Sequence, residues 1–346
     1  MNWGWPFAGA RRESKAAAPL IALSQLGVAA WGGRDAASLT QDGYLRNAVA
    51  YRCVRMVAEA AASVPLVTGH EAAAKLLRAP APDMAGASFL EGVYTQLQLA
   101  GNAFVEAVKI DGRDGVAALF ALRPDSVRPV TDARGWVEAW AVRERRGERL
   151  IRREDTGWSP VLHLKLFNPA DDVMGLPPLG AARRALDLHN ASADWAKALI
   201  DNSAKPSGAA NAGRPLLLEG GLEWRPMSLS PAEMDFQEAR NAAAREIALA
   251  LGVPPMLLGI PGDNTYSNYR EANLAFWRMT VLPLAEKTAA ALSLWLDEPL
   301  GGDVEVRCDV DRVPALSVER DALWARLEGA SFATPDEKRA IAGLGT

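Results

Sequence analysis

The stretch 250–277, ALGVPPMLLGIPGDNTYSNYREANLAFW, limits the possible folds more than any other part of the sequence. An alanine-rich helical pattern ends at Gly252 and at the pair Pro254-Pro255, because glycine ends helices readily and proline cannot continue one. The polar run IPGDNTYSN follows, and a second helical pattern begins directly after it. The chain therefore joins two helices through a loop that offers very little to an apolar core.

The composition is that of an ordinary globular protein. The chain has 346 residues, of which 49% are hydrophobic and 23% are charged, and its formal net charge is −4. Tight nucleic-acid binders usually carry a basic domain, which this balance does not suggest. The two cysteines, Cys53 and Cys308, cannot form a disulfide framework. We expect a soluble protein with reduced thiols, no signal peptide and no membrane-spanning segment.

Helical and strand periods alternate along the first half of the chain. Residues 1–43 show no sustained period and predict an extended arm, whereas 44–66, 70–80 and 88–101 predict helices. The arginine-rich run 143–154 predicts a solvated hairpin, and the alternative, a nucleic-acid patch, lacks interleaved aromatic residues. Short alternating runs predict one antiparallel sheet with hairpin turns: 103–110, 116–123, 126–130, 136–144 and 161–167.

The second half of the chain is mainly helical. Prolines and capping residues mark where its helices begin, and glycine marks where they end. Pro283 lies inside the longest helix and predicts a kink near 279–283. The predicted elements are a helix over 179–204 after Pro177-Pro178, two short strands around Gly220-Gly221, a helix from Ser230-Pro231 to Gly252, a helix over 269–298, a strand over 303–311, and helices over 319–330 and 334–345. The fold class is α+β.

No arrangement of residues predicts a catalytic site, a metal site or a bound cofactor. The three histidines, His70, His163 and His189, lie in separate elements and share no metal-binding spacing. The sequence contains no phosphate loop, dinucleotide fingerprint or nucleophile elbow. Four acidic residues remain as candidates for a metal pair: Asp171, Asp172, Asp309 and Asp311. A solvated turn explains the first two, and a hydrated strand end explains the other two, better than a metal does.

Eight segments, in the same order, resemble the portal proteins of long-tailed, lambda-like phages. The resemblance covers about residues 44–300, and the small size of the chain is similar to that of the portals of gene transfer agents. The segments are VAYRCVRMVAEAAASVPL, GNAFVEAV, LRPDSVRPV, MGLPPLGAARRAL, NSAKPSG, NAGRPLLLEGGLEWRPMSLSPAEMDF, REIALALGVPPMLLG and TYSNYREANLAFWRMTVLPLAEKTAAAL. An ordered set of this kind is far more specific than a single motif.

This resemblance implies a ring, usually of twelve subunits, at one vertex of a capsid. A terminase motor pumps DNA through the channel of such a ring, which later joins the head to the tail. The implied partners are further copies of the chain, double-stranded DNA, the terminase large subunit, the major capsid protein and a head–tail adaptor protein. No cofactor, membrane or enzymatic activity is implied, and the particle is expected to assemble in the bacterial cytoplasm.

The resemblance also divides the chain into parts. These are an N-terminal arm (1–43), an α/β wing (44–178), a stem helix (179–204), a small β-containing clip (205–228), a second stem helix (229–258), a tunnel loop (259–268), a tunnel helix (269–298), and a wing strand with a helical crown (299–346). One departure concerns the clip. Only Ala209 and Ala210 separate the PSG and NAGR signatures, where family members carry a helix, so the clip is expected to be shortened.

Three groups of site residues follow from this placement. The DNA-channel loop is Pro261, Gly262, Asp263, Asn264, Thr265, Tyr266, Ser267 and Asn268. Subunit packing in the tunnel helix is expected from Phe276, Trp277, Met279, Leu282 and Trp295. The clip residues that face the motor and the adaptor are Arg214, Glu219, Glu223, Trp224 and Arg225. Hydroxyl and amide groups suit a channel loop, because each fixed cation would add affinity for phosphate and hinder sliding.

Two alternative functions remain at this point. The first is a metal-dependent DNA-processing enzyme that uses the four acidic residues named above. The second is a monomeric adaptor protein that docks a partner through Trp3, Trp5 and Phe7 near its N-terminus. A ring-sized particle in solution would separate the portal from both.

Overall fold

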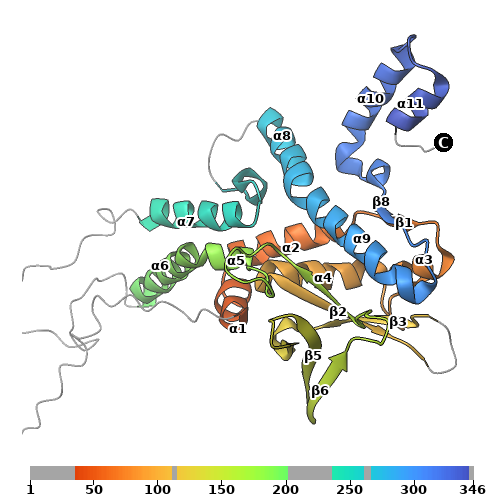
Figure 1. Ribbon diagram of the computed structural model, residues 1–346. Helices are drawn as coiled ribbons and strands as arrows, with labels where there is room; N and C mark the ends of the chain where they lie inside the picture. The colour runs from red at the N-terminus through yellow and green to blue at the C-terminus, as the bar shows by residue number, and fades with distance from the viewer. Residues whose placement is uncertain (1–35, 111–114, 202–235, 261–265, 343–346) are drawn as a thin grey trace, which may run out of the picture. The chain divides into compact units, whose positions relative to one another are not determined.

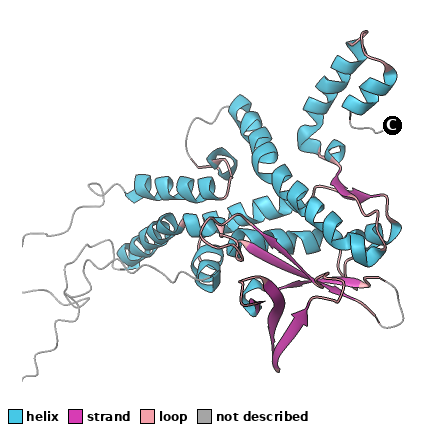
Figure 2. Ribbon diagram, viewed as in Figure 1, coloured by secondary structure: helices cyan, strands magenta, loops and turns pink. Residues whose placement is uncertain are grey.

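The computed structural model describes residues 36–110, 115–201, 236–260 and 266–342 of the chain (Figure 1). Helices and antiparallel strands both contribute to it, as Figure 2 shows, so the predicted α+β class is confirmed. Where helices were predicted the structure mostly has helices. The departures concern how the strands pair and where the helices break.

Helical structure begins earlier than the sequence predicted. The described part of the expected extended arm is helical, because α1 (Ala36–Ser38) leads directly into the π-helical turn η1 (Leu39–Leu45). Gly43 is buried, and its Cα lies against the side chain of Leu179. Packing against a distant segment, rather than a local period, therefore fixes this part of the chain.

The three helices predicted next are confirmed within slightly shorter bounds. They are α2 (Ala48–Ala62), α3 (Glu71–Arg78) and α4 (Gly86–Ala100), and α2 packs against α4. Asn47 caps α2, since its side-chain oxygen accepts hydrogen bonds of 3.1 and 3.0 Å from two amides of the first turn. Gly101 ends α4 with a φ of 69°, which glycine adopts readily. The fully buried residues of α2 follow helical spacing: Ala50, Cys53, Val54, Val57, Ala58 and Ala61.

The strands form two separate three-stranded sheets where one antiparallel sheet was predicted. The 3-10 turn η2 (Pro124–Ser126) separates them along the chain, because its proline cannot donate to a ladder. The first sheet has the order β3 (Ala118–Leu122), β2 (Asn102–Val108), β7 (Val161–Lys165), and the second β4 (Val127–Thr131), β5 (Val137–Glu144), β6 (Gly147–Arg152). All their pairings are antiparallel.

The arginine-rich hairpin is solvated, as predicted. It comprises the end of β5, the turn and β6, and within β6 only Ile151 is buried. Arg149 pairs with Glu106 at 2.6 Å and with Glu144 at 2.7 Å, so its charge is already matched within the sheets. A small core holds the two sheets together: Phe104, Val127, Trp140, Val142, Ile151 and Val161.

A third pairing joins segments that are far apart in the sequence. β1 (Leu66–Thr68) pairs antiparallel with β8 (Val306–Cys308). The strand predicted over 303–311 is therefore short. The alternation of a strand predicts that Asp309 and Asp311 point to the same face. Instead, Asp309 lies at the N-cap position of the 3-10 turn η6 (Val310–Arg312), without a side-chain capping hydrogen bond, and Asp311 lies inside this turn, so that prediction is wrong.

The long helices of the second half are interrupted. The helix predicted over 179–204 is α5 (Pro178–Ala181) followed by α6 (Arg183–Asp201). The kink expected near Pro283 takes the form of a π-helical turn, because proline has no amide hydrogen for the α-helical ladder and the wider turn absorbs the defect. The remaining elements here are α7 (Phe236–Ala250), η3 (Pro255–Leu258), α8 (Tyr266–Phe276), η4 (Trp277–Val281) and α9 (Leu282–Asp297).

The C-terminal part contains the two predicted helices. The 3-10 turns η5 (Glu298–Leu300) and η7 (Pro314–Leu316) flank β8, and α10 (Ser317–Gly329) and α11 (Pro335–Ile341) follow. Thr334 and Glu337 form a capping box at the start of α11. None of the helices in the part of the chain that the structure describes is long and apolar enough to cross a bilayer.

Candidate functional site

The segment that joins α7 to α8 is tied to the π-helical turn of the next helix. Gly252 ends α7 with a φ of 67°, and the Thr280 hydroxyl donates a 2.7 Å hydrogen bond to its carbonyl oxygen. A Cβ at Gly252 would lie 2.5 Å from Thr280 Oγ1, so only glycine permits this approach. Gly259 also has a positive φ, of 70°, but its surroundings are open. Contact with Thr280 therefore requires glycine at position 252, whereas Gly259 ends the 3-10 turn η3 at a place where an added Cβ would meet nothing.

The predicted DNA-channel loop is shorter than the sequence suggested. Pro261–Thr265 lie outside the described residues, but Tyr266, Ser267 and Asn268 form the first turn of α8. The assignment of these three residues to a loop is therefore wrong. None of them is a proline or a glycine, so nothing in the local sequence prevents the helix from starting at Tyr266.

Two of the five residues expected at subunit contacts are buried inside their own subunit. Phe276 is 3% exposed and Trp295 is 7% exposed. Trp295 Nε1 donates a 2.8 Å hydrogen bond to the Ser159 carbonyl, and Trp158 Nε1 donates one of 2.8 Å to the Trp295 carbonyl. Both side chains are covered within the subunit, and the indole N–H of Trp295 already has a hydrogen-bond partner. Phe276 and Trp295 therefore cannot form a subunit contact, and that prediction is wrong. Trp277 and Leu282 are half-buried against the same core.

Met279 differs from the other four because 79% of it is exposed. It lines an open groove of about 550 Å³ together with Leu249, itself 78% exposed, and with Val253 and Pro254. Arg245 and Glu246 also line this groove. Of the predicted packing residues, Met279 leaves the largest share of its apolar surface open to another subunit.

The residues predicted to contact the motor and the adaptor lie outside the described part of the chain. These are Arg214, Glu219, Glu223, Trp224 and Arg225.

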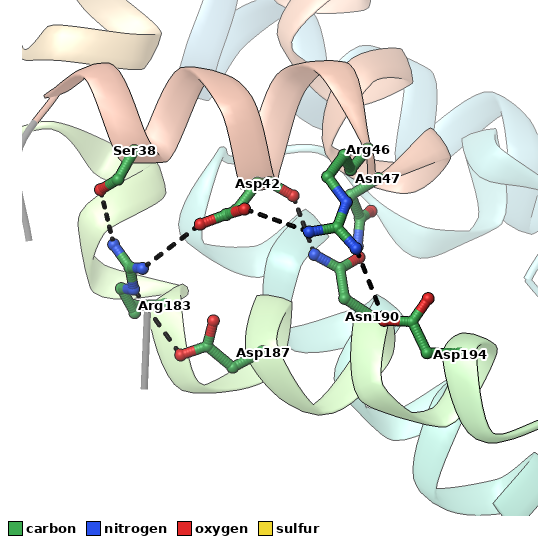
Figure 3. A network of polar contacts seen from close by, with 8 residues as sticks. All are labelled: Ser38, Asp42, Arg46, Asn47, Arg183, Asp187, Asn190 and Asp194. Atoms are coloured by element: carbon green, nitrogen blue, oxygen red, sulfur yellow. Dashed lines mark hydrogen bonds and ion pairs between the residues drawn. The ribbon is translucent and has the colours of Figure 1, made fainter. Parts of the chain in front are cut away.

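A polar network connects η1 to α6, as Figure 3 shows. Arg183 forms one end of it: its guanidinium is 3.3 Å from Ser38 Oγ, 3.8 Å from an Asp42 oxygen and 3.6 Å from an Asp187 oxygen. The side chain of Arg183 is only 15% exposed, so these contacts are screened less than surface pairs. Arg46 bridges Asp42 and the more exposed Asp194 at 3.5 Å each.

The network continues through two asparagines to α7. Asn47 Nδ2 donates to Asn190 Oδ1 at 2.9 Å and lies 3.1 Å from His189 Nδ1, while Asn190 Nδ2 donates to the Asp42 carbonyl at 2.8 Å. The Arg240 guanidinium of α7 approaches His189 Nε2 at 3.5 Å. Burial, with the Arg240 charge as a smaller cause, lowers the pKa of His189, so the imidazole is neutral near pH 7. These contacts fix the relative positions of η1, α6 and α7.

A close backbone crossing, which sequence reasoning missed, fixes the start of α5. Asn102 is 3% exposed, and its side chain accepts a 2.7 Å hydrogen bond from the Gly175 amide and donates to the Ala100 carbonyl at 2.7 Å. A Cβ at Gly101 would lie 2.6 Å from the Pro177 nitrogen. The two segments that form this crossing, GNAFVEAV and MGLPPLG, are both among those that resemble portal proteins. Nothing in either segment alone indicates that they touch.

His163 belongs to the same crossing. Its Nε2 is 2.8 Å from Asn102 Oδ1, and its ring stacks on Phe104 with centroids 4.5 Å apart and an interplanar angle of 11°. Asn102 Oδ1 is an acceptor, so His163 donates from Nε2 and is held in one neutral tautomer. Burial, with the nearby Lys165 charge as a smaller cause, lowers the pKa of His163 from 6.5 to about 4.

This pKa predicts a loss of stability in acid. Above about pH 6.5 His163 is neutral in both states; as the pH falls toward 4, the unfolded chain binds a proton that the folded chain does not. The free energy of unfolding should therefore decrease by up to about 1.4 kcal/mol per pH unit over this range, and His163→Gln should remove this component. Urea unfolding of both proteins between pH 7 and pH 4 measures the difference.

The comparison isolates His163, because His189 is present in both proteins. Parallel pH curves for the parent and His163→Gln would show that the folded histidine titrates normally.

Neither a metal-binding cluster nor a reactive thiol is found in the described ranges. No group of three or more His, Cys, Asp or Glu residues lies close enough there to hold a metal ion. The Asp171 carboxylate accepts hydrogen bonds from the Val173 and Met174 amides, at 2.7 and 2.9 Å, which lower its pKa and account for its position in a turn. Burial raises the pKa of Cys53 to about 12 and that of Cys308 to about 11, so neither thiol is a reactive thiolate.

The comparison with known families decides which class of protein this is. The sequence profile of the phage portal protein family matches residues 48–210 and 207–343. The chain belongs to the phage portal protein family. The two matched segments of this portal overlap at residues 207–210.

Relatives and solved structures agree with this membership. The portal chain is 37% identical to an uncharacterized protein of Rickettsia bellii over 91% of each chain, and 23% identical to the portal protein of Enterobacteria phage HK97, covering 79% of this chain and 72% of that one. A chain from the neck of a native gene transfer agent (GTA) particle, computed with C12 symmetry, matches with a TM-score of 0.75 at 44% identity, covering 94% of this chain and 98% of that one.

A crystal structure of an HK97-family phage portal protein from Corynebacterium diphtheriae matches at a TM-score of 0.54 and 14% identity, covering 79% of this chain and 96% of that one. This likeness shows the shared fold. The predicted resemblance to portal proteins, including those of gene transfer agents, is confirmed.

Proposed function

We propose that this portal protein forms the ring at the vertex of a phage-like particle, most closely a gene transfer agent, through which DNA enters and leaves. The observation that carries the proposal is the match, at 44% identity over 94% of the chain, to a chain in the neck of a native GTA particle computed with C12 symmetry. The two chains also match over nearly their whole lengths, since 98% of that chain is covered, which supports a similar arrangement in the particle.

The ring is proposed to have twelve subunits and to serve as a passive conduit. Twelve copies would carry a formal net charge of −48, because each chain carries −4. A net negative charge disfavours tight, nonspecific binding of the DNA backbone. The terminase large subunit, the major capsid protein and a head–tail adaptor are the proposed partners, and assembly is proposed to occur in the bacterial cytoplasm.

The parts of the subunit are assigned within this proposal. α6 and α7 form the stem, the residues between them form the shortened clip, and α8 to α9 form the tunnel helix, with the loop of Pro261–Thr265 facing DNA. Met279 and Leu249 contribute apolar surface to the contact between subunits, since both are largely exposed in the single chain. The clip residues Arg214 and Trp224 face the motor and the adaptor.

The proposed protein is not an enzyme. The family is a structural component of assemblies, and the alternative of a metal-dependent DNA-processing enzyme has little support from the acidic candidates. The Asp171 carboxylate accepts a hydrogen bond within a turn, and the described residues hold no group of three or more His, Cys, Asp or Glu residues that could bind a metal. The monomeric adaptor, the second alternative, predicts no ring at all.

Purified protein tests the proposal directly. Native mass spectrometry and negative-stain images should show closed rings of about 444 kDa, which corresponds to twelve chains of 37.0 kDa. The same preparation should hydrolyse neither ATP nor DNA in the presence of magnesium. A stable monomer at micromolar concentration would favour the adaptor, and nuclease activity that disappears in Asp171→Asn would favour the enzyme.

A further inference from the structure

An open cleft of about 670 Å³ lies beside the free edge of β7. β7 is the last strand of its sheet, because the strand order is β3, β2, β7. Successive residues of a strand point to opposite faces, and both Leu162 and His163 line the cleft, so the cleft opens along the edge of the strand. Its volume lies within the range of about 300–1,000 Å³ that is usual for ligand sites.

The backbone of His163 faces this cleft. A 2.9 Å hydrogen bond from the Leu166 amide to the Gly101 carbonyl fixes the phase of the β2–β7 ladder, because bonded and non-bonded pairs alternate in an antiparallel ladder. His163, three residues before Leu166, therefore directs its amide and carbonyl groups away from β2. Neither group has a hydrogen-bond partner among the residues that the structure describes.

The carbonyl groups two residues before and after His163 on this edge are already bonded. Ser159 Oγ donates to the Val161 carbonyl at 2.9 Å. Lys287 Nζ donates to the Lys165 carbonyl at 2.6 Å. An unpaired amide and carbonyl at a strand edge are the groups to which an extended peptide adds. The free edge is therefore short, and it accepts one peptide residue as a hydrogen-bonded pair with His163.

The rim of the cleft is basic. It carries Arg134, Arg153 and Lys165 against one carboxylate, that of Asp172. None of the three cations forms an ion pair within the described part of the chain. Arg153 donates instead to two backbone carbonyls, at 3.3 and 3.1 Å, and Lys165 donates to two others. Carbonyl groups position these cations without neutralising them, so the rim attracts an anionic group.

The floor of the cleft is aromatic. Trp140 and Trp295 are 5% and 7% exposed, whereas Trp136 is 72% exposed and lies beside Arg134 in the lining. Tryptophan and arginine around a desolvated pocket are typical of sites that hold one anchoring side chain. Because the two buried indoles expose almost no ring face, the floor suits a bulky apolar side chain better than the stacked base of a nucleic acid.

We infer that this cleft binds an extended, acidic segment of a partner protein, which adds to β7 as an antiparallel strand. One bulky apolar residue of that segment pairs with the His163 backbone and packs beside Trp136 and Trp140, because residues directly opposite each other lie on the same face of a sheet. The residue two positions earlier lies opposite Lys165, where a carboxylate forms a cross-strand ion pair.

Charge complementarity selects a partner rather than this chain's own N-terminal segment. Residues 1–35 contain four basic and two acidic residues, so their charge has the same sign as the rim of the cleft. The cleft lies within one subunit and is present whether or not rings form.

A peptide of defined sequence tests the site on the full-length protein. The probe is fluorescein-labelled Asp-Glu-Thr-Phe-Thr-Glu-Asp with an amidated C-terminus, and fluorescence anisotropy should show saturable binding with a dissociation constant below about 1 mM. An analogue methylated on the Phe nitrogen cannot donate to the His163 carbonyl and should bind at least about tenfold more weakly. An analogue with Asn and Gln in place of the acids should bind at least about fivefold more weakly at low salt, and this difference should shrink at high salt.

Substitutions in the protein locate the binding site. Trp136→Ser and Arg153→Gln should each weaken binding of the probe by at least about fivefold. Arg145→Gln is the matched control, because it removes the same charge from an exposed position in the β5–β6 turn, outside the cleft, and it should bind like the parent. Thermal unfolding checks that each variant is folded, and Arg134→Gln takes the place of Arg153→Gln if loss of the carbonyl contacts of Arg153 unfolds the protein.

Several outcomes would overturn the proposed site. These are no saturable binding below about 1 mM, equal binding of the N-methylated peptide, and equal losses in Arg145→Gln and Arg153→Gln. Tighter binding of a thymidine hexanucleotide would overturn it in favour of a nucleic-acid site. Tighter binding of a peptide of residues 1–12 would overturn it too, because the chain's own N-terminal segment would then fill the cleft. Native mass spectrometry measures ring formation separately, so failure of the site leaves the ring proposal standing.

Discussion

Gly175→Ala is expected to yield no soluble, folded protein. Gly175 lies where the backbone of the MGLPPLG segment crosses that of GNAFVEAV. A methyl group there would lie 2.8 Å from the Leu166 carbonyl oxygen, 2.9 Å from the Leu166 nitrogen and closer still to the Gly101 carbonyl oxygen. All three are backbone atoms, so no side chain can rotate away to make room. The crossing would have to open, and the buried Asn102 would lose its hydrogen bonds to Gly175.

The expected cost is more than about 4 kcal/mol, which is exceptional for a single methyl group and comparable to the total stability of many domains. The measurement is the soluble fraction after expression, followed by urea unfolding of any soluble material. Gly92→Ala is the matched control, because Gly92 lies within α4 and a Cβ there would meet nothing within 4 Å. It should be soluble and more stable by about 0.5–1 kcal/mol, since alanine suits a helix interior better than glycine.

A soluble Gly175→Ala protein whose midpoint lies close to that of the parent would show that the crossing can relax. It would also mean that these two segments resemble portal signatures for a reason other than their contact with each other.

Local patterns in the sequence predicted most of the helices, because each carried its own period and its own cap. α2 is an example: its buried positions repeat at helical spacing and Asn47 caps it. η1 could not be predicted this way, since it is held by Gly43 against Leu179 and by Asp42 with Arg183, partners far away along the chain. The β1–β8 pairing could not be predicted either, because it joins distant segments and a three-residue strand has almost no period to detect.

The predicted subunit contacts show a different limit of sequence-based prediction. The helix predicted over 269–298 is apolar on several faces, and the sequence alone does not tell which of them faces the subunit interior. The fold separates them: Phe276 and Trp295 pack inside the subunit, whereas Met279 is exposed. Phe276 and Met279 are three positions apart, a spacing that places residues on one face of a regular α-helix. The π-helical turn η4, which begins after Phe276 and contains Met279, breaks this spacing. Sequence reasoning placed both at the subunit contact because it used hydrophobicity without the direction of the core.

The largest functional effect is expected from the loop that precedes α8. Replacing Pro261–Thr265 by a three-residue Gly-Ser linker should leave rings of normal mass, because Gly259 lies in open surroundings and α8 begins independently at Tyr266. Particles built with this variant should contain at most about a tenth of the packaged DNA of the parent. On the proposal that this loop lines the channel, a shorter loop would not reach the duplex, and DNA would slip back whenever the motor pauses.

A charge variant of the same loop tests the effect of its affinity for DNA separately from the effect of its length. Asn264→Lys with Thr265→Lys adds two cations per subunit, hence on the order of two phosphate contacts for each subunit that touches DNA at a given moment. Packaging should slow, and raising the salt concentration should relieve the defect, since counterion release weakens each contact. Asn264→Gln with Thr265→Ser is the neutral control and should package like the parent at every salt concentration.

The two variants together decide whether this loop touches DNA. Packaging assays with purified rings, capsids and motor measure the rate, and the DNA content of filled particles measures retention. A salt-dependent defect confined to the lysine variant, together with poor retention confined to the short loop, would place Pro261–Thr265 at the constriction. If both variants assemble, fill and hold DNA like the parent, the loop only connects α7 to α8, and the narrowest part of the channel must be formed by another segment.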